Sequence, residues 1–553
     1  MTENKDFLKL KSGTDIRGVA IDGVPGESIN LTDDVLEKIA TSFAVWLSQE
    51  KNKNFKNLSV SIGHDSRISA GRIKSVLVKT LSTLGIKIFD CGLSSTPAMF
   101  MTTIDLNCDA AIEITASHHP FNRNGLKFFT NNGGLDGADI EKILNGAEKK
   151  FNFSKADRLF VRKVYYMKTY AARLRKIICD GIGEKEESKP LSGLKIVVDA
   201  GNGVGGFYAT DVLKPLGADI SGSQFLKPDG NFPNHMPNPE DKAAIKSVIE
   251  ATLRNHADLG LIFDTDVDRA GAVDCDGNEI CKNSLIALAS KIALKNNFGG
   301  TVVTDSVTSD GLHDYIESEL HGVHDRFKRG YKNVINEAKR LNSQGINCPL
   351  AIETSGHAAL RENYFLDDGA YLVTKIVIEL VNLRRQDKNF SDILDKLKKP
   401  IESVEFRLKI LCENFKIYGE KVINDLFTYA QNRNGWKIAS DNKEGIRISF
   451  DKTSGNGWLL LRMSVHDPVM PLNIESNEVG GIKLILQNLE EFMKKYTEMN
   501  HEELLALKKE LDKEFEEIKA QGLALDMSRG KPSNAQLALS MDMMDVLKGD
   551  SDL

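Results

Sequence analysis

Short apolar segments alternate with amphipathic helical segments along the sequence, and this alternation restricts the possible fold more than any other feature. The pattern predicts a helix over 32–47, a strand over 58–62, a helix over 70–84 and a strand over 86–89. Similar apolar segments, each followed by a polar loop, recur near residues 194, 259, 299 and 348. Alternating strands and helices predict an α/β protein. In open α/β sheets, ligands bind at the loops beyond the carboxyl ends of strands, so we expect functional residues there.

Composition indicates an ordinary globular protein with several domains. The chain has 553 residues, 41% hydrophobic and 27% charged, and a formal net charge of -6,. This charge gives no electrostatic support to a nucleic-acid partner. Seven cysteines without a Cys-x-x-Cys pair predict reduced thiols,. No signal sequence and no membrane-spanning run of about 18 apolar residues is recognisable, so we expect a cytoplasmic protein.

One serine stands out in the segment 115–127, TASHHPFNRNGLK. Ser117 follows the stretch DAAIEITA at 109–116, which predicts a short buried strand,. Residues 120–125 predict an exposed loop, and its Asn-Gly turn leads to Lys127. A serine at the end of a strand is placed to meet a ligand, but it needs a base, a metal or a phosphate before it can carry chemistry. The Gly-x-Ser-x-Gly elbow is absent, which disfavours a serine triad. A serine that merely caps a turn is the alternative.

A second polar loop, DTDVDR at 264–269, directly follows an apolar strand predicted over 257–263. Its three alternating carboxylates suit a hard divalent cation that prefers oxygen ligands: Asp264, Asp266 and Asp268. An EF-hand would need a glutamate at the twelfth loop position, where Cys275 stands,. A metal site, a phosphatase that uses Asp264 as its nucleophile, and a solvated acidic turn all stay open at this point.

The two loops together resemble the α-D-phosphohexomutase family, which includes phosphoglucomutases, phosphomannomutases and phosphoglucosamine mutases. Further motifs of the family follow in order: GTDIRG at 13–18, GHDSR at 63–67, Thr96-Pro97 at the strand end before the serine loop, VDAGNG at 198–203, PDGNFP at 228–233, GYK at 330–332, ETSGH at 353–357 and DDG at 367–369. The resemblance implies an α/β fold with three related α/β/α sandwich domains plus a smaller α+β C-terminal domain around a central cleft. We expect the domains at 1–180, 181–282, 283–398 and 399–493, followed by a tail at 494–553.

The resemblance also implies an isomerase that interconverts hexose 1-phosphate and hexose 6-phosphate through a phosphoserine and a hexose 1,6-bisphosphate intermediate. Phosphoryl transfer depends on alignment and charge neutralisation. One Mg²⁺ per chain would be held by a phosphoserine oxygen and the three carboxylates. The implied catalytic residues are Ser117, Lys127, His118, His357, Arg17 and Arg269. The implied substrate-binding residues are Glu353, Ser355, Lys332, Arg462 and Ser464.

Individual roles follow from the same resemblance. Lys127 is the implied proton handler, which would require a lowered pKa in a cationic site. His118 and His357 could assist proton transfer because histidine titrates near neutrality, and the two arginines would stabilise the transferred phosphoryl group. His119 and His466 are expected to be structural. The expected partners are small-molecule sugar phosphates, and the expected assembly is a monomer or a small homo-oligomer.

The fourth-domain phosphate loop, RMSVHDPVMPLNI at 462–474, departs from the family pattern. Most relatives have Arg-Pro-Ser-Gly-Thr-Glu-Pro, and the Gly-Thr-Glu part is replaced by Val-His-Asp at 465–467. Losing the glycine removes its freedom for positive φ. The preferred hexose therefore stays open, as do two other functions: a Mg²⁺-dependent aspartyl phosphatase acting on sugar phosphates and a non-catalytic phosphosugar-binding protein.

The tail at 494–553 begins with apolar residues at helical spacing and continues into a polar stretch with Gly and Pro. This pattern predicts a helix and a disordered end. Its segment LDMSRGKPS resembles the N-terminal part of a pyridoxal-phosphate aminotransferase of the alanine/aspartate type. The tail is too short to contain a Schiff-base lysine domain, so we expect no transaminase activity.

Overall fold

The structure is a computed structural model that describes residues 7–151, 153, 155–156, 159–411, 415–464 and 468–497. The chain divides into two units after Ile485, within its last described helix. His466 and nearly all of the predicted helical and disordered tail lie outside the described residues. The description below concerns the first unit.

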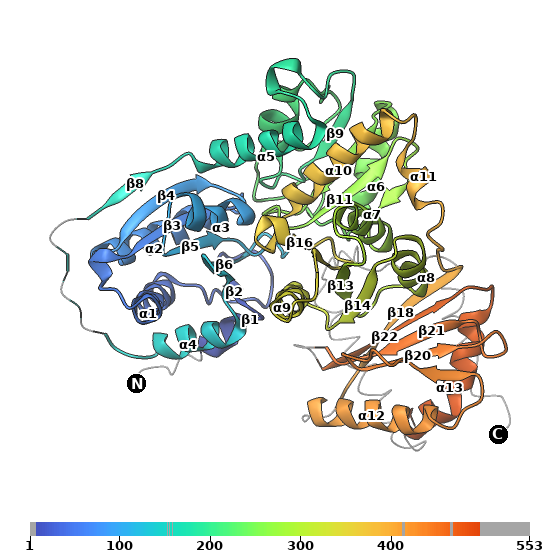
Figure 1. The fold of residues 1–553 in the computed structure, drawn as a ribbon. Coiled ribbons are helices and arrows are strands. Elements are labelled where there is room, and N and C mark those ends of the chain that lie inside the picture. The colour runs from blue at the N-terminus through green and yellow to red at the C-terminus, as the bar shows by residue number, and fades with distance from the viewer. Residues whose placement is uncertain are drawn as a thin grey trace. The chain divides into compact units, whose positions relative to one another are not determined.

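Four sheets follow one another along the chain (Figure 1). The first has the order β1-β2-β6-β5-β3-β4-β8, with β7 paired to β6. Its strands are β1 (Lys11–Ser12), β2 (Asp15–Val19), β3 (Ser59–His64), β4 (Lys87–Leu93), β5 (Ala110–Ile114), β6 (Arg123–Thr130), β7 (Gly133–Gly134) and β8 (Val161–Lys163). Helices α1 (Asp33–Lys51), α2 (Ala70–Thr83) and α4 (Gly137–Ala147) share one apolar core with this sheet, and α3 (Thr96–Asp105) contributes to another.

The second sheet has the order β12-β11-β10-β9 and the third β14-β13-β15-β16-β17. Their strands are β9 (Ile196–Asp199), β10 (Leu259–Phe263), β11 (Ala270–Asp274), β12 (Glu279–Ile280), β13 (Thr301–Asp305), β14 (Val323–Phe327), β15 (Leu350–Ile352), β16 (Ala358–Leu360) and β17 (Leu366–Asp367). The helices in this part are α5 (Tyr166–Ile182), α6 (Lys242–Arg254), α7 (Asn283–Leu294), α8 (Asp310–Asp314), α9 (Tyr331–Ser343), α10 (Gly369–Arg384) and α11 (Phe390–Leu394).

The fourth sheet is antiparallel, in the order β18-β22-β21-β20-β19. Its elements are β18 (Glu402–Lys409), α12 (Phe415–Ala430), β19 (Trp436–Ile438), β20 (Ile446–Phe450), β21 (Gly457–Leu461), β22 (Val469–Ser476) and α13 (Gly481–Thr497). Short helical turns elsewhere are η1 (Phe7–Leu10), η2 (Phe55–Asn57), η3 (Glu186–Ser188), η4 (Tyr208–Leu213), η5 (Lys214–Leu216), η6 (Tyr315–Glu319) and η7 (Arg361–Asn363). The predicted class, three α/β/α domains plus a smaller α+β domain, is confirmed.

The alternating pattern of the sequence corresponds closely to the observed elements. The helix predicted over 32–47 is α1, whose N-cap Thr32 accepts a hydrogen bond from the backbone of Val35 (3.4 Å),. Acidic Asp33 and Asp34 occupy its first turn, where the helix dipole favours negative charge,. The apolar segments predicted as strands are confirmed as β3, β4, β5, β9, β10, β13 and β15.

The exposed loop predicted over 120–125 is wrong in its second half. Asn122 and Asn124 are fully buried, and β6 has already begun between them. Their side-chain amides donate hydrogen bonds to Glu27 and Ser69 (2.9 Å each). The buried NH2 group of each asparagine therefore has a partner, while Asn122 Oδ1 has none among the described residues, and the sequence does not reveal these contacts.

Gly125 explains why the Asn-Gly pair forms a strand instead of the predicted turn. A Cβ at this position would lie 2.3 Å from the carbonyl oxygen of Ile16 and 2.8 Å from that of Thr115. Only glycine therefore lets β6 fit between its two neighbours at this point. The strand continues to Thr130 and carries Lys127, whose side chain lies in the site described below.

The motif Thr96-Pro97, expected at the end of a strand, instead begins helix α3. The preceding strand ends at Leu93, and Ser95 caps the helix by accepting a hydrogen bond from the backbone of Ala98 (3.3 Å). Proline suits the first turn of a helix because no backbone N–H is needed there. The start of the helix, and not a strand end, therefore faces the functional loops.

Much of the first unit shares one apolar core, which includes residues of α3, α5, α7 and α10 together with the second sheet. The strand ends of the first three sheets are consequently held in a common framework. The cysteines within the described residues are free thiols, as predicted. Among the helices described, none has the length and apolar character needed to cross a membrane.

Candidate active site

Ser117 lies just beyond β5 and is buried, with 2% of its surface exposed. Its backbone has a φ of 50°, which is uncommon for a residue other than glycine,. The hydroxyl donates a hydrogen bond to Asp264 Oδ2 (2.9 Å) and accepts one from Arg269 Nη2 (3.1 Å). The two loops singled out in the sequence therefore meet at this hydroxyl, which lies at a site and not at a surface turn.

Arg67 holds the serine loop in place, a role that the sequence did not reveal. Its side chain is fully buried and pairs with Asp65, with 3.2 Å between Nε and Oδ2. Its two terminal nitrogens donate hydrogen bonds to four main-chain carbonyls, those of Ser117, His119, Pro120 and Arg123. The conformation of the loop therefore depends on one buried guanidinium group.

The three aspartates of the second loop form a compact group of buried carboxylates. Asp264, Asp266 and Asp268 each offer an oxygen atom within 4.8 Å of the others. One oxygen each of Asp266 and Asp268 is buried without a hydrogen-bond partner among the described residues. Burial, together with the charges of its two neighbours, raises the pKa of Asp264 well above its usual range,. Unpartnered buried oxygens and mutual repulsion both fit a divalent cation with oxygen ligands.

The carboxylate loop is held in a strained conformation by contacts from both sides. Val267 has a φ of 67°, which is unfavourable for a β-branched residue,. Its carbonyl accepts a hydrogen bond from the backbone of Gly369 (3.1 Å), where a Cβ would lie 2.7 Å from Arg269. From the first domain, Thr96 donates hydrogen bonds to the backbone and carboxylate of Asp266 (2.9 and 2.5 Å). The carboxylate loop is thus held between the start of α3 and the DDG motif.

Lys127 lies among these carboxylates, which corrects the expected cationic environment. Its ammonium group pairs with Asp266 Oδ2 (2.9 Å) and with Asp268. Burial alone would lower the pKa of Lys127, but the two carboxylates hold it well above its usual range. The lowered pKa expected for a proton handler is therefore not found in this arrangement.

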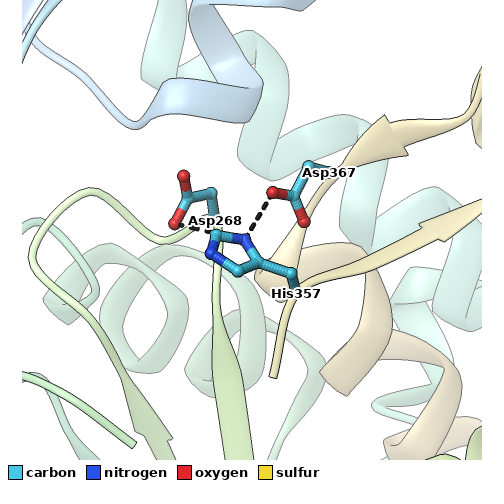
Figure 2. Close-up of side chains that lie close together, drawn as sticks. All are labelled: Asp268, His357 and Asp367. Atoms are coloured by element: carbon cyan, nitrogen blue, oxygen red, sulfur yellow. Dashed lines mark hydrogen bonds and ion pairs between the residues drawn. The ribbon is translucent and has the colours of Figure 1, made fainter. Parts of the chain in front are cut away.

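His357 lies between two carboxylates, as Figure 2 shows. Its Nδ1 is 2.5 Å from Asp367 Oδ2 and 3.9 Å from Asp268 Oδ1. Burial opposes a positive charge, yet these carboxylates raise the pKa of His357 to about 9. The ring is therefore protonated at neutral pH, which corrects the expectation of titration near neutrality. A protonated ring cannot ligate a metal, so the three-aspartate group fits a metal better than the overlapping group of Asp268, His357 and Asp367.

His118 has the opposite electrostatic environment. Burial and the nearby Arg269 lower the pKa of His118 far below its usual range, so its ring is neutral. Arg269 donates a hydrogen bond to Nδ1, and the same nitrogen is 3.3 Å from Ser117 Oγ. The positive charge of Arg17 also lowers this pKa. Arg17 lies on β2 opposite Gly125 and donates a hydrogen bond to Asp15 (2.8 Å), so of the two predicted arginines Arg269 is the one that contacts the Ser117 hydroxyl.

The predicted sugar-binding residues Glu353 and Ser355 are buried in the loop after β15. Glu353 accepts a hydrogen bond from the backbone of Gly330 (2.6 Å), and burial raises its pKa to about 7. Lys332 instead points to the first domain, where its ammonium group donates to the carbonyl of Gly134 and lies 3.4 Å from Asp136. The structure thus brings Glu353 and Ser355 together, while Lys332 is engaged by the first domain.

Arg462 follows β21 at the start of the variant phosphate loop and is 7% exposed. Its Nε has no hydrogen-bond partner among the described residues. Burial lowers its pKa, Glu444 opposes this effect and Arg329 adds to it. The backbone of Ser464 donates to the carbonyl of Val469 (2.9 Å), while the substituted positions 465–467 lie outside the described residues.

Arg329 and Glu240 are neighbours of the site that the sequence analysis missed. Glu240 Oε2 lies 3.5 Å from Arg269 Nη1, and its other oxygen lies 3.5 Å from Arg329 Nη2. The only signals in the sequence are that Arg329 directly precedes the GYK motif and that Glu240 follows the PDGNFP motif by seven residues. Neither residue belongs to a motif that would have predicted a functional role.

Comparison with known proteins agrees with this geometry. Residues 9–153, 168–277 and 282–400 match the family models of phosphoglucomutase/phosphomannomutase alpha/beta/alpha domains I, II and III. A phosphoglucomutase of Neisseria gonorrhoeae is 28% identical over 466 residues, which cover 84% of this chain and 93% of that protein. A phosphomannomutase/phosphoglucomutase of Pseudomonas aeruginosa is 29% identical over 434 residues, covering 78% and 86% respectively.

Solved structures show the same fold. A phosphoglucomutase/phosphomannomutase family protein from Burkholderia thailandensis has a TM-score of 0.72 at 24% identity, covering 90% of this chain and 99% of that chain. Parafusin from Paramecium, in its open form, has a TM-score of 0.68 at 16% identity, with 88% and 95% covered. Residues 499–553 match the model of aspartate amino-transferase, in agreement with the resemblance of the tail.

Proposed function

Since the chain belongs to the phosphoglucomutase/phosphomannomutase family, we propose that it interconverts hexose 1-phosphates and hexose 6-phosphates of glucose, mannose or both. It is then an isomerase that acts through a phosphoserine and a hexose 1,6-bisphosphate. One observation carries this proposal: the buried Ser117 hydroxyl lies within hydrogen-bond distance of both Asp264 and Arg269. A phosphoryl group on this oxygen would lie next to both the carboxylates that fit a metal ion and the guanidinium of Arg269.

In the first half-reaction, the bond between Ser117 Oγ and phosphorus breaks as a sugar hydroxyl oxygen bonds to phosphorus and gives up its proton. The bisphosphate then reverses its orientation in the cleft, and its other phosphoryl group is transferred to Ser117. Arg269 and Arg17 would stabilise charge on the transferred group, which suits forked donors. His357 is protonated and fits a proton donor, whereas the strongly lowered pKa of His118 makes its neutral ring too weak a base to take up the sugar proton,. The family resemblance gives that role to Lys127, which would lose its own proton once a cation shields the carboxylates that now raise its pKa,.

Mg²⁺ fits the oxygen ligands of Asp264, Asp266 and Asp268, where it would neutralise phosphate charge and polarise the phosphoryl group,. The family resemblance supports one such ion per chain. Glu353 and Ser355 would contact ring hydroxyls, and Arg462 and Ser464 would contact the distal phosphate. Lys332 would bind the substrate from its position beside the first domain. We further propose a cytoplasmic monomer or small homo-oligomer whose partners are sugar phosphates.

An aspartyl phosphatase at Asp264 is the alternative from another reaction class. It would release free phosphate and would not need Ser117. Asp264 already accepts hydrogen bonds from Ser117 and Arg269 and belongs to the three-aspartate group that fits a cation, so its carboxylate is committed to other contacts. The mutase proposal is therefore favoured.

The two reactions are separated by one pair of variants. Purified protein, supplied with Mg²⁺ and glucose 1,6-bisphosphate, should convert glucose 1-phosphate or mannose 1-phosphate to the 6-phosphate and should carry phosphate on Ser117. Ser117→Ala should lose at least about 100-fold in kcat, since a covalent nucleophile is removed. Ser75→Ala in α2 is the matched control and should retain activity. Full mutase activity in Ser117→Ala would refute the mechanism, and phosphate release that survives this change would support the phosphatase.

A further inference from the structure

Glu240 lies between two arginines that come from different parts of the site. Its Oε2 is 3.5 Å from Arg269 Nη1, beside the serine, and its Oε1 is 3.5 Å from Arg329 Nη2. Arg269, Glu240 and Arg329 therefore form a row of alternating charges that begins beside Ser117 and ends in the third domain. Arg329 therefore occupies the end of this row that is remote from Ser117.

The guanidinium of Arg329 is held by charge but has only long contacts. Besides Glu240, its nearest ion-pair partner is Asp305, with 3.9 Å between Nε and Oδ2. Both distances exceed the roughly 2.7–2.9 Å of a well-formed charge-assisted hydrogen bond. The side chain remains 29% exposed. Its N–H groups are consequently available to an incoming anion at little cost in existing contacts.

The backbone of Arg329 joins the third sheet to the fourth. Its N–H donates to Glu444 Oε2 (3.2 Å), which also accepts a hydrogen bond from the hydroxyl of Ser306 (2.5 Å). Glu444 lies just before β20, whose neighbour β21 leads into Arg462. Gly445, the next residue, packs against the main chain of Arg462, where a Cβ would lie 2.8 Å from the Arg462 Cα. The positive charge of Arg329 also lowers the pKa of Arg462.

An anionic ligand that contacts both guanidinium groups would relieve the repulsion between Arg329 and Arg462, on which the carboxylates of Asp305 and Glu405 also act. Arg462 supports this interpretation independently, because its Nε is buried and has no hydrogen-bond partner among the described residues. Glu353, the proposed reader of sugar hydroxyls, also acts electrostatically on Arg329. Arg329, Arg462 and Glu353 therefore supply two forked cations and an acceptor for hydroxyl groups.

We propose that Arg329 is a substrate-binding residue that pairs with Arg462 to hold the phosphate not being transferred. This inference rests on the proposed mutase function and extends it. A guanidinium can donate two parallel hydrogen bonds to phosphate, and two of them match a dianion in charge. The second arginine also supplies donors in a chain whose phosphate loop lacks the usual Gly-Thr-Glu segment. The competing assignment is a structural ion pair that merely links Glu240 and Asp305.

Binding and turnover of Arg329→Met and Arg329→Lys test the assignment. We expect Arg329→Met to raise the KM for hexose 1-phosphate at least about 30-fold with a smaller change in kcat, because a phosphate contact of about 2 kcal/mol is lost. Arg329→Lys should recover part of this loss, since it keeps the charge but not the fork. Arg340→Met, an exposed arginine of α9 paired to Glu337, is the control and should keep the wild-type KM.

Calorimetric binding of glucose 1,6-bisphosphate to proteins that also carry Ser117→Ala separates this inference from the mutase proposal. Weaker bisphosphate binding in the Arg329→Met background, with unchanged thermal stability, would support the phosphate contact. Unchanged binding there would overturn the assignment even if the wild-type enzyme is an active mutase. A fall in kcat and thermal stability without any change in KM or binding would overturn it too, in favour of the structural ion pair.

Discussion

The sharpest stability prediction concerns Arg67, whose single side chain supports the serine loop. Arg67→Met keeps most of the apolar stem and removes every guanidinium N–H. The change breaks the buried pair with Asp65 and leaves four loop carbonyls without their donors. We expect the serine loop to lose its fixed conformation while the surrounding sheet stays folded.

The magnitude follows from the burial of the pair. Removing one partner of a buried ion pair costs about 3–5 kcal/mol, because the other charge is left uncompensated. Burial already raises the pKa of Asp65 to about 6, and the loss of Arg67 would raise it further, so Asp65 can take up a proton. Protonation limits the penalty to the lower part of that range, and we expect a loss of about 3 kcal/mol at pH 7.

Hydrogen exchange of the backbone and mass spectrometry of the phosphorylated protein provide the assay. Amides of residues 115–123 should exchange faster in Arg67→Met, and phosphate on Ser117 after incubation with glucose 1,6-bisphosphate should fall at least about tenfold, corresponding to about 1.4 kcal/mol. Adding Asp65→Asn should restore part of the lost stability, because no buried charge is then left alone. Arg162→Met, on the exposed strand β8, is the control. Wild-type exchange and phosphorylation in Arg67→Met would refute the reasoning.

Two further predictions concern pH and metal. Burial raises the pKa of Glu475 from 4.5 to about 7, so the free energy of unfolding should fall as pH rises from 4.5 to above 7. Urea titrations at pH 4.5 and 8 should show that Glu475→Gln removes up to about 3 kcal/mol of this pH dependence. An equal change in unfolding free energy with pH in both proteins would contradict the prediction. Chelation of Mg²⁺ should abolish turnover, and Mg²⁺ at 100 times its Kd should add about 2.7 kcal/mol to the free energy of unfolding. Asp266→Asn should lose this stabilisation, which differential scanning calorimetry would measure, whereas an undiminished gain would exclude the three-aspartate site.

The sequence was most informative where local pattern decides structure. Apolar segments that end in polar loops identified the strands before Ser117 and Asp264, because burial of a strand leaves a signature within a few residues,. The family motifs then placed both loops in one site. The hydrogen bond between the two side chains spans 147 positions, and no local rule could have supplied it.

Prediction was weakest where environment comes from distant charges. Lys127 was expected to have a lowered pKa, but its neighbours are carboxylates of another domain. His357 was expected to titrate near neutrality, but Asp367 and Asp268 raise its pKa to about 9. Arg329 and Arg67 went without assigned roles, because their partners are carboxylates and main-chain carbonyls brought close only by the tertiary fold.

The pairing of Lys127 with Asp266 and Asp268 also has a consequence for the timing of assembly during translation. The lysine precedes these partners by 139 and 141 residues, and ribosomes add about 5–20 residues per second. Roughly 7–30 s therefore pass in which β6 carries an ammonium group whose two ion-pair partners have not yet been made. The group formed by Lys127 and the aspartates can thus assemble only after about half of the chain has been synthesised.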